Sequence, residues 1–600
     1  MYQTNKLKQT TMKLTYLRSL AALLCLIFSS STTIAQTYVN PLPLPYVINN
    51  DTIELRADTL LHNFNPNGTD TLNTLVKTFA YNHIDSTSNT FLGPIIVWKH
   101  GINLHTTVKN NIPQLITVHW HGAHVPPLAD GNPHEPIQEG ATWKIDFPIL
   151  DEPATMWYHP HIHQHSFEQT EMGMAGMLYV ENTSDTMHSK LPHTYGVDDF
   201  PIIIQERKFK KLNGKTVIDT SGASGNVTII NGVKDPYLRV PAQMVRFRIL
   251  NGSGKMAYYM GIGNSSLQPV PMTLIATDAG LTEQPFQIDS ILMGAGVRSE
   301  WVLDLNNRQG DTLYLMNYAR SIPDNTIGSA NLHGSSASTF MMIIVGEQTP
   351  EPIVTLPTTF PALAIPDTML TSKRRTKTFY GNFGGPNNST SFTINHKPFD
   401  MSYINDTVML GATEIWTIHN RTNLSHPFHI HDIHFFILDI WDSISEGYID
   451  VPVEFKGPKD NVLVRPGWKL RFVTQFLDWG TPIAPMNAYM VHCHILPHED
   501  KGMMGQFVVW DGVSSIDAQD MGNQMILYPN PAHNELYLKG KTTEISEVRI
   551  YDISGRLLST QLLSPMDGTI KLNIDGLQSG IAIVELQTSK GRSTRKVIIN

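Results

Sequence analysis

A stretch around residue 493 places one thiol between two imidazoles. Residues 492–498 read His-Cys-His-Ile-Leu-Pro-His, and Met503 follows the cysteine by ten positions. Blue-copper electron-transfer sites use a cysteine thiolate, histidines and a weak axial methionine. Cys493, His498 and Met503 could supply three such ligands, with a second histidine from elsewhere. Because successive side chains on a strand face opposite sides, His492 and His494 would belong to a different cluster.

Histidine pairs of the form His-x-His recur along the chain. Twenty-five histidines in 600 residues would give about one such pair by chance, and the chain has six. Four of the pairs lie in distinct contexts: His119-Trp-His121, His159-Pro-His161, His429-Ile-His431 and His492-Cys-His494, with His426 just before the third. On a strand both imidazoles of a pair face one side. Eight neutral imidazoles without a carboxylate suit three copper ions better than zinc or oxygen-preferring cations.

The N-terminal residues have the composition of an export signal. Residues 1–36 carry four basic side chains and no acid, then an apolar run at 20–28 and small residues near 35. This pattern predicts a cleaved signal peptide. The run is too short to span a bilayer and no later stretch is longer, so we expect no transmembrane segment. Exported proteins use cysteines in pairs to form disulfides, but only Cys493 would remain after removal of the signal peptide. The single cysteine therefore favours metal ligation over a disulfide.

The elements that must position these residues are predicted to be strands. Short runs rich in Val, Ile, Thr and Tyr alternate with Gly and Pro turn signals, which favours β-sandwiches. The net charge of −9 becomes more negative without the basic leader, so nucleic acid is excluded as an expected partner. Six hundred residues are too many for one core and predict several domains.

Composition shifts divide the chain into seven segments. We expect a signal peptide at 1–36, sandwich domains at 37–192, 193–348 and 375–512, linkers at 349–374 and 513–525, and a small C-terminal β-sandwich at 526–600. The prolines at 350–366 mark the first linker. The middle domain lacks a dense histidine cluster, so its predicted role is architectural. The histidine pairs lie in the first and third domains, so these two must pack on each other.

All four histidine motifs, in this order, resemble the copper-binding signatures of multicopper oxidases, over about residues 40–512. The bacterial laccase and copper-efflux-oxidase branch is the most similar, including Met172-Gly-Met174-Ala-Gly176. The resemblance implies an all-β fold of three cupredoxin-like Greek-key sandwiches and four coppers per chain. It assigns His119 and His429 to the type 2 copper, His121, His159, His161, His431, His492 and His494 to the type 3 pair, and His426, Cys493, His498 and Met503 to the type 1 copper.

The resemblance also points to two acids. Asp130 and Glu499 fall where similar oxidases place carboxylates that relay protons for oxygen reduction. Asp130 precedes a glycine and would also suit a plain turn, and Glu499 could be a solvated surface acid. His124, His163, His165 and His434 are expected to lie near the ligands or at the surface without ligating.

The C-terminal segment begins Tyr528-Pro-Asn-Pro and ends Lys596-Val-Ile-Ile. Together with the Asp552-Ile-Ser-Gly-Arg turn, these motifs make it similar to the sorting domains of type IX secretion cargo. The resemblance implies passage through the periplasm to the cell surface or medium, with the type IX machinery as a partner. The alternative is an ordinary carbohydrate-binding or spacer sandwich.

Three functions follow as hypotheses. The first is a laccase-like oxidase that couples oxidation of a phenol or aromatic amine to reduction of dioxygen to water. The second is a metallo-oxidase that oxidises cuprous ion, which the overall likeness favours. The family's methionine-rich insertion is absent, however, and Thr422 stands where an acidic ligand is expected. The third is a non-catalytic copper binder, while a copper nitrite reductase would not need eight histidines.

Overall fold

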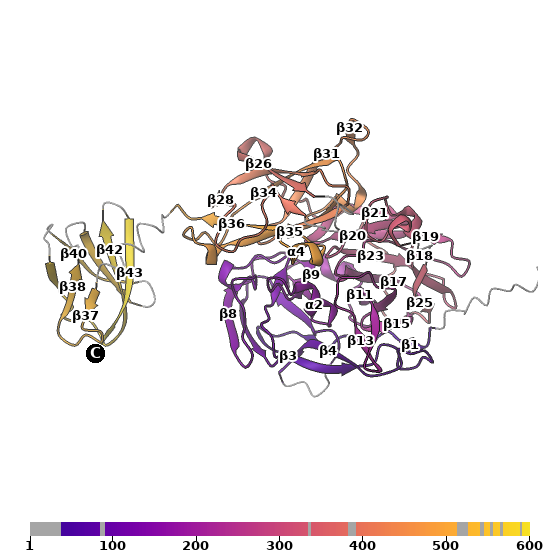
Figure 1. Ribbon diagram of the computed structural model, residues 1–600, viewed down its shortest axis with the longest axis horizontal. Helices are drawn as coiled ribbons and strands as arrows, with labels where there is room; N and C mark the ends of the chain where they lie inside the picture. Colours follow the sequence, from indigo (N-terminus) through magenta and orange to yellow (C-terminus); the bar gives the residue numbers. More distant parts are fainter. Residues whose placement is uncertain are drawn as a thin grey trace, which may run out of the picture.

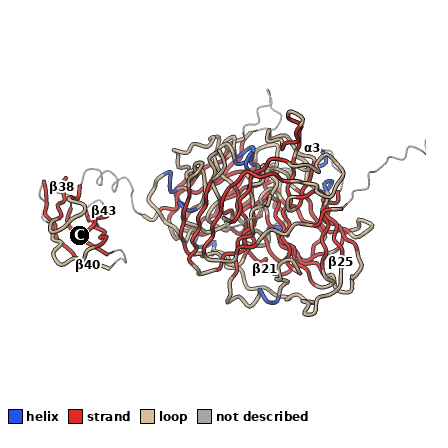
Figure 2. Tube along the Cα trace, turned by 90° about the horizontal axis from the view of Figure 1, so that it is seen from below, coloured by secondary structure: helices blue, strands red, loops and turns tan. Residues whose placement is uncertain are grey.

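A computed structural model of the protein describes residues 38–84, 90–333, 338–381, 392–512, 526–540, 545–552, 556–563, 568–588 and 591–600. The predicted signal peptide and the 513–525 linker lie outside these residues. Strands dominate the described chain and its helices are short, which confirms the all-β prediction (Figure 2). None of the described helices has both the length and the apolar character needed to cross a membrane.

The first domain is a sandwich of two sheets. One sheet has the order β2-β5-β10-β9-β7 (Val47–Ile48, Ile95–Lys99, Gly176–Glu181, Ala154–His159, His119–His121) and the other β4-β3-β6-β8 (Val76–His83, Thr52–His62, Asn103–Asn110, Thr142–Pro148). Strand β6 alternates exposed and buried residues, as expected for a sheet with one face on the core. Trp98, Trp120 and Tyr158 fill the space between the sheets.

The middle domain pairs two larger sheets. Their orders are β15-β14-β11-β17-β23-β20-β21 (Val233–Lys234, Val227–Ile230, Asp199–Arg207, Met244–Asn251, Arg298–Asp304, Met272–Thr277, Gly280–Ile288) and β1-β16-β25-β24-β18-β19 (Asn40–Pro41, Pro236–Val240, Ser338–Val345, Thr312–Asn317, Tyr258–Gly263, Pro269–Val270), with β22 (Ser290–Met293) beside β18. Strand β1, from the segment predicted for the first domain, pairs with β16 of the middle domain.

The third domain follows the proline-rich stretch. Its sheets have the orders β27-β26-β29-β34-β31-β32 (Thr393–Ile394, Thr371–Tyr380, Thr413–Asn420, Trp468–Gln475, Phe435–Asp442, Gly447–Ile449) and β28-β36-β35-β30-β33 (Asp406–Met409, Met504–Trp510, Tyr489–Cys493, His426–Ile430, Asn461–Val464). Residues 350–367 form no helix or strand, in keeping with an extended linker. Strand β26 begins at Thr371, four residues before the predicted domain start.

Both neighbours of the first domain pack closely on it (Figure 1). An apolar cluster that includes Phe91, Trp157, Ile203 and Leu250 joins it to the middle domain. Toward the third domain, helix α2 (Ser166–Glu171) contacts helix α4 (Leu496–Glu499). The Asp500 carboxylate accepts hydrogen bonds from the first two backbone N–H groups of α2, each at 3.0 Å. The predicted contact between the first and third domains is therefore confirmed.

The C-terminal unit has its own core of two sheets. Their orders are β37-β38-β41 (Ile526–Tyr528, Leu536–Gly540, Gly568–Leu572) and β40-β39-β42-β43 (Leu557–Leu562, Ile545–Asp552, Gly580–Thr588, Gly591–Ile599). Apolar residues from both sheets, such as Leu538, Val548 and Val584, form this core. Figure 1 shows the unit apart from the other three domains. The predicted C-terminal β-sandwich is confirmed.

Candidate metal centres

Two strand pairs bring the four histidine motifs together. In the first domain β7 pairs with β9, and His119 lies opposite His159. In the third domain β30 pairs with β35, and His429 lies opposite His492. Because paired residues on neighbouring strands lie close together, the ladders themselves gather the imidazoles.

Three of the four pairs are not wholly on a strand as predicted. His431 and His494 directly follow the last residue of their strands, and His161 lies two residues beyond the end of β9. Pro160 lacks an N–H and cannot extend the β9 ladder, so the strand ends at His159. Although they lie beyond the strand ends, His161, His431 and His494 are still buried in the cluster.

The eight histidines of these pairs form one buried cluster between the first and third domains. Each is at most 1 % exposed. The Nε2 atom of His492 lies 3.1 Å from that of His161 and 3.3 Å from that of His431. The Nδ1 atom of His121 lies 3.4 Å from Nε2 of His159.

The remaining members, His494, His119 and His429, lie in the same cluster. The ring centroid of His494 lies 4.9 Å from that of His121 and 5.3 Å from that of His159. The rings of His119 and His429 are 5.8 Å apart. His119 stacks more closely on His431, at 3.8 Å, and His429 more closely on His121, at 3.6 Å. The eight imidazoles thus form one continuous cluster, and their division between the type 2 and type 3 ions stays a prediction.

The imidazoles are suited to bind a metal in their neutral form. Burial lowers the pKa of His161 to about 3, and it lowers the pKa values of His159, His431, His492 and His494 well below 6.5. Within the described residues the Nε2 atoms of His119 and His429 and both ring nitrogens of His494 have no hydrogen-bond partner. Buried polar atoms normally have partners. Unpaired nitrogens among neutral imidazoles fit copper as the missing partner.

The metal-free cluster should make folding sensitive to acid. Between pH 6.5 and about 3 the unfolded chain protonates histidines that stay neutral in the fold, so the free energy of unfolding falls as the pH drops. We expect the Tm of the copper-free protein to decrease through this window. Thermal melts should show a shallower pH slope for His161→Gln than for a control, His165→Gln, in which the replaced histidine is exposed. Equal slopes for the two variants would contradict this prediction.

A second group surrounds Cys493. Its Sγ atom lies 3.4 Å from Nδ1 of His426 and 3.8 Å from Nδ1 of His498. Met503 is fully buried, and its backbone carbonyl accepts a hydrogen bond from the Cys493 N–H at 3.1 Å. The Thr422 hydroxyl lies 2.9 Å from Nε2 of His426, and the other ring nitrogen, Nδ1, faces the Cys493 sulfur. The structure therefore brings the residues predicted for the type 1 site together.

An aromatic ring packs against both histidines of this group. The ring of Phe392 lies 4.7 Å from that of His426 and 4.5 Å from that of His498. His426 and Cys493 are fully buried, whereas His498 is 7 % exposed.

The two predicted acids are buried against the imidazole cluster. The Asp130 carboxylate lies 2.8 Å from Nδ1 of His431 and 3.3 Å from Nδ1 of His119. The Glu499 carboxylate lies 3.0 Å from Nδ1 of His492 and 3.4 Å from Nδ1 of His161. Both acids are at most 1 % exposed, so neither is a solvated surface group. Their role in proton transfer stays a prediction.

A third acid, Asp460, was missed by sequence reasoning. One of its carboxylate oxygens lies 3.1 Å from Nε2 of His121, and its backbone carbonyl lies 2.9 Å from Nδ1 of His429. Burial would raise the pKa of Asp460, but the Arg298 guanidinium holds it well below its usual range. Asp460 lies just before β33, outside any histidine motif, and only its nearness in the fold reveals it.

Other histidines near the cluster have different partners. Nδ1 of His124 lies 3.4 Å from the buried Asp432 carboxylate. Burial would lower the pKa of His124, but hydrogen bonding and the charge of Asp432 raise it to about 9. Nε2 of His434 lies 2.6 Å from the Gly122 carbonyl. Asp432 has a φ of +70°, a conformation that aspartate tolerates better than most residues.

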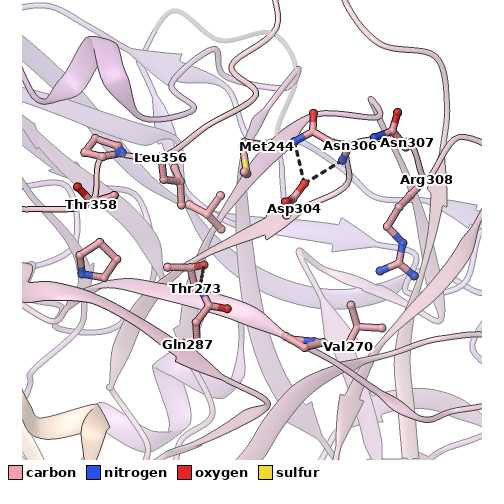
Figure 3. A pocket seen from close by; sticks show the side chains of 14 residues that line it. Met244, Val270, Thr273, Gln287, Asp304, Asn306, Asn307, Arg308, Leu356 and Thr358 are labelled. Carbon is pink, nitrogen blue, oxygen red and sulfur yellow. Dashed lines mark hydrogen bonds between the residues drawn. The ribbon is translucent and has the colours of Figure 1, made fainter.

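A large surface hollow lies elsewhere, in the middle domain. Its volume is about 710 Å³, and Figure 3 shows Met244, Thr273, Gln287, Asp304 and Arg308 along its wall. Its polar side chains bond to one another, as Thr273 does with Gln287 at 2.7 Å. None of the candidate metal ligands lines it.

Comparisons with known proteins agree with this arrangement. Family models described as multicopper oxidase match residues 75–185, 210–337 and 361–513. A model described as a secretion system C-terminal sorting domain matches residues 526–600. Multicopper oxidase mco of Staphylococcus haemolyticus is 30% identical over 73% of this chain and 85% of its own length.

Other relatives and solved structures cover a similar part of the chain. Cell division protein FtsP of Escherichia coli is 26% identical over 70% of this chain and 84% of its own length. The laccase-like multicopper oxidase CueO from Ochrobactrum sp. superposes with a TM-score of 0.65 at 28% identity, over 78% of this chain and 100% of that one. The metallo-oxidase from Campylobacter jejuni shares the fold, with a TM-score of 0.61 at 22% identity over 80% of this chain and 98% of that one.

Three cupredoxin-like sandwiches with buried histidine and cysteine clusters define a copper-dependent oxidoreductase. The chain belongs to the multicopper oxidase family and carries a C-terminal sorting domain. It is an oxidoreductase with dioxygen as acceptor.

Proposed function

We propose that the protein couples one-electron oxidation of phenol-like or aromatic amine donors to the four-electron reduction of dioxygen to water. Four copper ions per chain would take part, one at the Cys493 group and three among the eight imidazoles. The observation that carries this proposal is the position of Cys493. Its neighbours in sequence, His492 and His494, both belong to the buried imidazole cluster, while its own sulfur faces His426 and His498.

Separate groups of residues would hold the type 1 ion and pass electrons to the trinuclear centre. Copper, when bound, supplies the one-electron chemistry and the site for oxygen reduction. His426, Cys493, His498 and Met503 would hold the type 1 ion, and the backbone of Cys493 gives a short covalent path to two ligands of the trinuclear centre. The slightly exposed His498 ring is the point of contact for the donor.

The buried acids would move protons. Asp130 and Glu499 contact ring nitrogens of cluster histidines, so each lies one imidazole away from the space where oxygen would be reduced. Oxygen reduction to water consumes protons, and a positioned carboxylate can supply them. Burial of the whole cluster keeps bulk water away from it.

An organic donor is favoured over cuprous ion by two features. Thr422 hydrogen-bonds His426 where the resemblance leads us to expect an acidic metal ligand. The 349–374 linker contains one methionine, Met369, so it lacks a thioether-rich surface for cuprous ion. The Ochrobactrum structure, described with oxidase activity towards lignin model compounds, also supports an organic donor. The Campylobacter metallo-oxidase keeps cuprous ion as the second candidate.

A substrate comparison tests the proposal. We expect kcat/KM of the copper-loaded protein for phenols such as 2,6-dimethoxyphenol to exceed that for cuprous ion. Oxygen consumption measured with each donor, with the copper-free protein as control, gives both values. A clear preference for cuprous ion would reverse the ranking. Absence of oxygen consumption with either donor would favour a non-catalytic copper binder.

The sorting domain bears on location. Its match indicates secretion or display at the cell surface, and we extend this to export through the periplasm by the type IX machinery. A donor at the cell surface or in the medium is consistent with an oxidase for organic compounds.

A further inference from the structure

One side chain of the middle domain, Arg298, contacts Asp460 beside the imidazole cluster. This residue begins strand β23 and is fully buried. One guanidinium nitrogen donates a hydrogen bond to the Asp460 carboxylate at 2.8 Å, and a second guanidinium nitrogen contacts the other carboxylate oxygen. A bidentate pair of this kind fixes the carboxylate in direction as well as in position.

Arg298 touches all three large domains. Its Nε donates to the carbonyl of Thr155 in the first domain at 3.2 Å, and a further nitrogen donates to the carbonyl of Asp278 in its own domain at 3.0 Å. Asp460 belongs to the third domain. The guanidinium is therefore held at the junction where the three domains meet.

The first histidine motif leaves room for this ion pair. A Cβ atom added at Gly122 would lie 2.5 Å from an Arg298 nitrogen and 2.5 Å from an Asp460 oxygen. Gly122 also has a φ of +93°, which side-chain-bearing residues rarely adopt. The glycine after His121 thus allows the Arg298–Asp460 pair to approach the motif.

Asp460 in turn sets the directions of two cluster histidines. Its carboxylate contacts Nε2 of His121 at 3.1 Å, so the Nδ1 atom of that ring points toward His159. Its carbonyl accepts a hydrogen bond from Nδ1 of His429, and Nε2 on the opposite side of that ring has no hydrogen-bond partner among the described residues. Partners of this kind fix the tautomer and orientation of metal-binding histidines.

We propose that Arg298 is a positioning residue of the trinuclear centre, supplied by the middle domain, which acts through Asp460 on His121 and His429. The inference rests on the proposed function, because it assumes copper at this cluster. It would add a specific contact to the architectural role predicted for the middle domain.

The test compares Arg298→Met with Arg248→Met. Arg248 is also buried in the middle domain and forms a bidentate pair, with Asp199 at 2.8 Å, but has no described contact with a cluster histidine. Both variants should lower the Tm of the copper-free protein, because each leaves a buried carboxylate without its partner. Both should keep the blue absorption of the type 1 site.

The copper readouts separate the two roles. For Arg298→Met we expect an altered type 2 EPR signal and an affinity of the trinuclear centre for copper that is about 10–100-fold weaker, as for other partners of metal-binding histidines. For Arg248→Met both should match the wild type. Arg298→Lys keeps the charge but loses the bidentate geometry, so its EPR signal and copper affinity should lie between those of the wild type and Arg298→Met. If Arg298→Met does not fold, the EPR signal of Arg298→Lys tests the inference.

Two results would count against the inference and one against its premise. A wild-type EPR signal and copper affinity in the Arg298 variants would overturn it, as would the same changes in Arg248→Met. A wild-type protein that binds no copper at the imidazole cluster would instead refute the proposed function.

Discussion

Replacement of Cys493 by serine is expected to abolish the blue absorption and to reduce turnover of organic donors. Loss of a residue that only supports a metal ligand can cost about 100-fold in activity, so loss of the ligand itself should cost more than that. A hydroxyl is a hard ligand and a poor substitute for the soft thiolate that selects copper in such sites. The variant also breaks the short route from the donor contact at His498 to the imidazole cluster. Visible absorption and oxygen consumption measure the two effects.

The rest of the centre provides the internal control for Cys493→Ser. All eight cluster imidazoles remain, so the type 2 EPR signal should persist and the copper content should fall by about one ion per chain. Serine has nearly the same size and shape as cysteine, so the fully buried site loses little packing. Turnover within a few-fold of the wild type would show that donors deliver electrons by another route.

Glu499→Gln is expected to have the second largest effect. The variant keeps the shape of the side chain but removes its proton-carrying carboxylate beside His161 and His492. We expect steady-state oxygen reduction at neutral pH to fall about 100-fold or more, within the usual contribution of a positioned general acid. Anaerobic reduction of the type 1 site by the donor should keep its rate, because the Glu499 carboxylate contacts His161 and His492 rather than the side chains of the cysteine group.

Glu206→Gln is the matched control for that variant. Burial raises the pKa of Glu206 to about 8, so this acid is mostly protonated at neutral pH and glutamine resembles its neutral form. Glu206 has no described contact with a cluster histidine, and its variant should turn over at the wild-type rate. Equal activities of the Glu499 and Glu206 variants would remove Glu499 from the proton path.

Much of the fold and of the candidate site could be predicted because both depend on short-range sequence pattern. Alternating strands and turn residues indicate sandwiches, and the His-x-His spacing indicates which side chains face one side of a strand. The presence of ligand motifs in the first and third domains required those domains to pack together. The buried contacts between His161 and His492 confirm this.

What could not be predicted depends on long-range contacts. Asp460 and Arg298 belong to no motif, and their link exists only where three domains meet. Strand β1 belongs to the middle domain because it pairs with β16. This partner is almost 200 residues away, so the neighbouring sequence does not reveal the pairing. The ends of β30 and β35 before their last histidines are, in contrast, a matter of local backbone geometry that the His-x-His spacing does not reveal.

Anomalous diffraction at the copper absorption edge, from crystals of the copper-loaded protein, tests the central claim most directly. The account predicts one peak between Cys493, His426 and His498 and three peaks among the eight cluster imidazoles. A map without a peak beside the Cys493 sulfur, or with a single peak among the imidazoles, would contradict it.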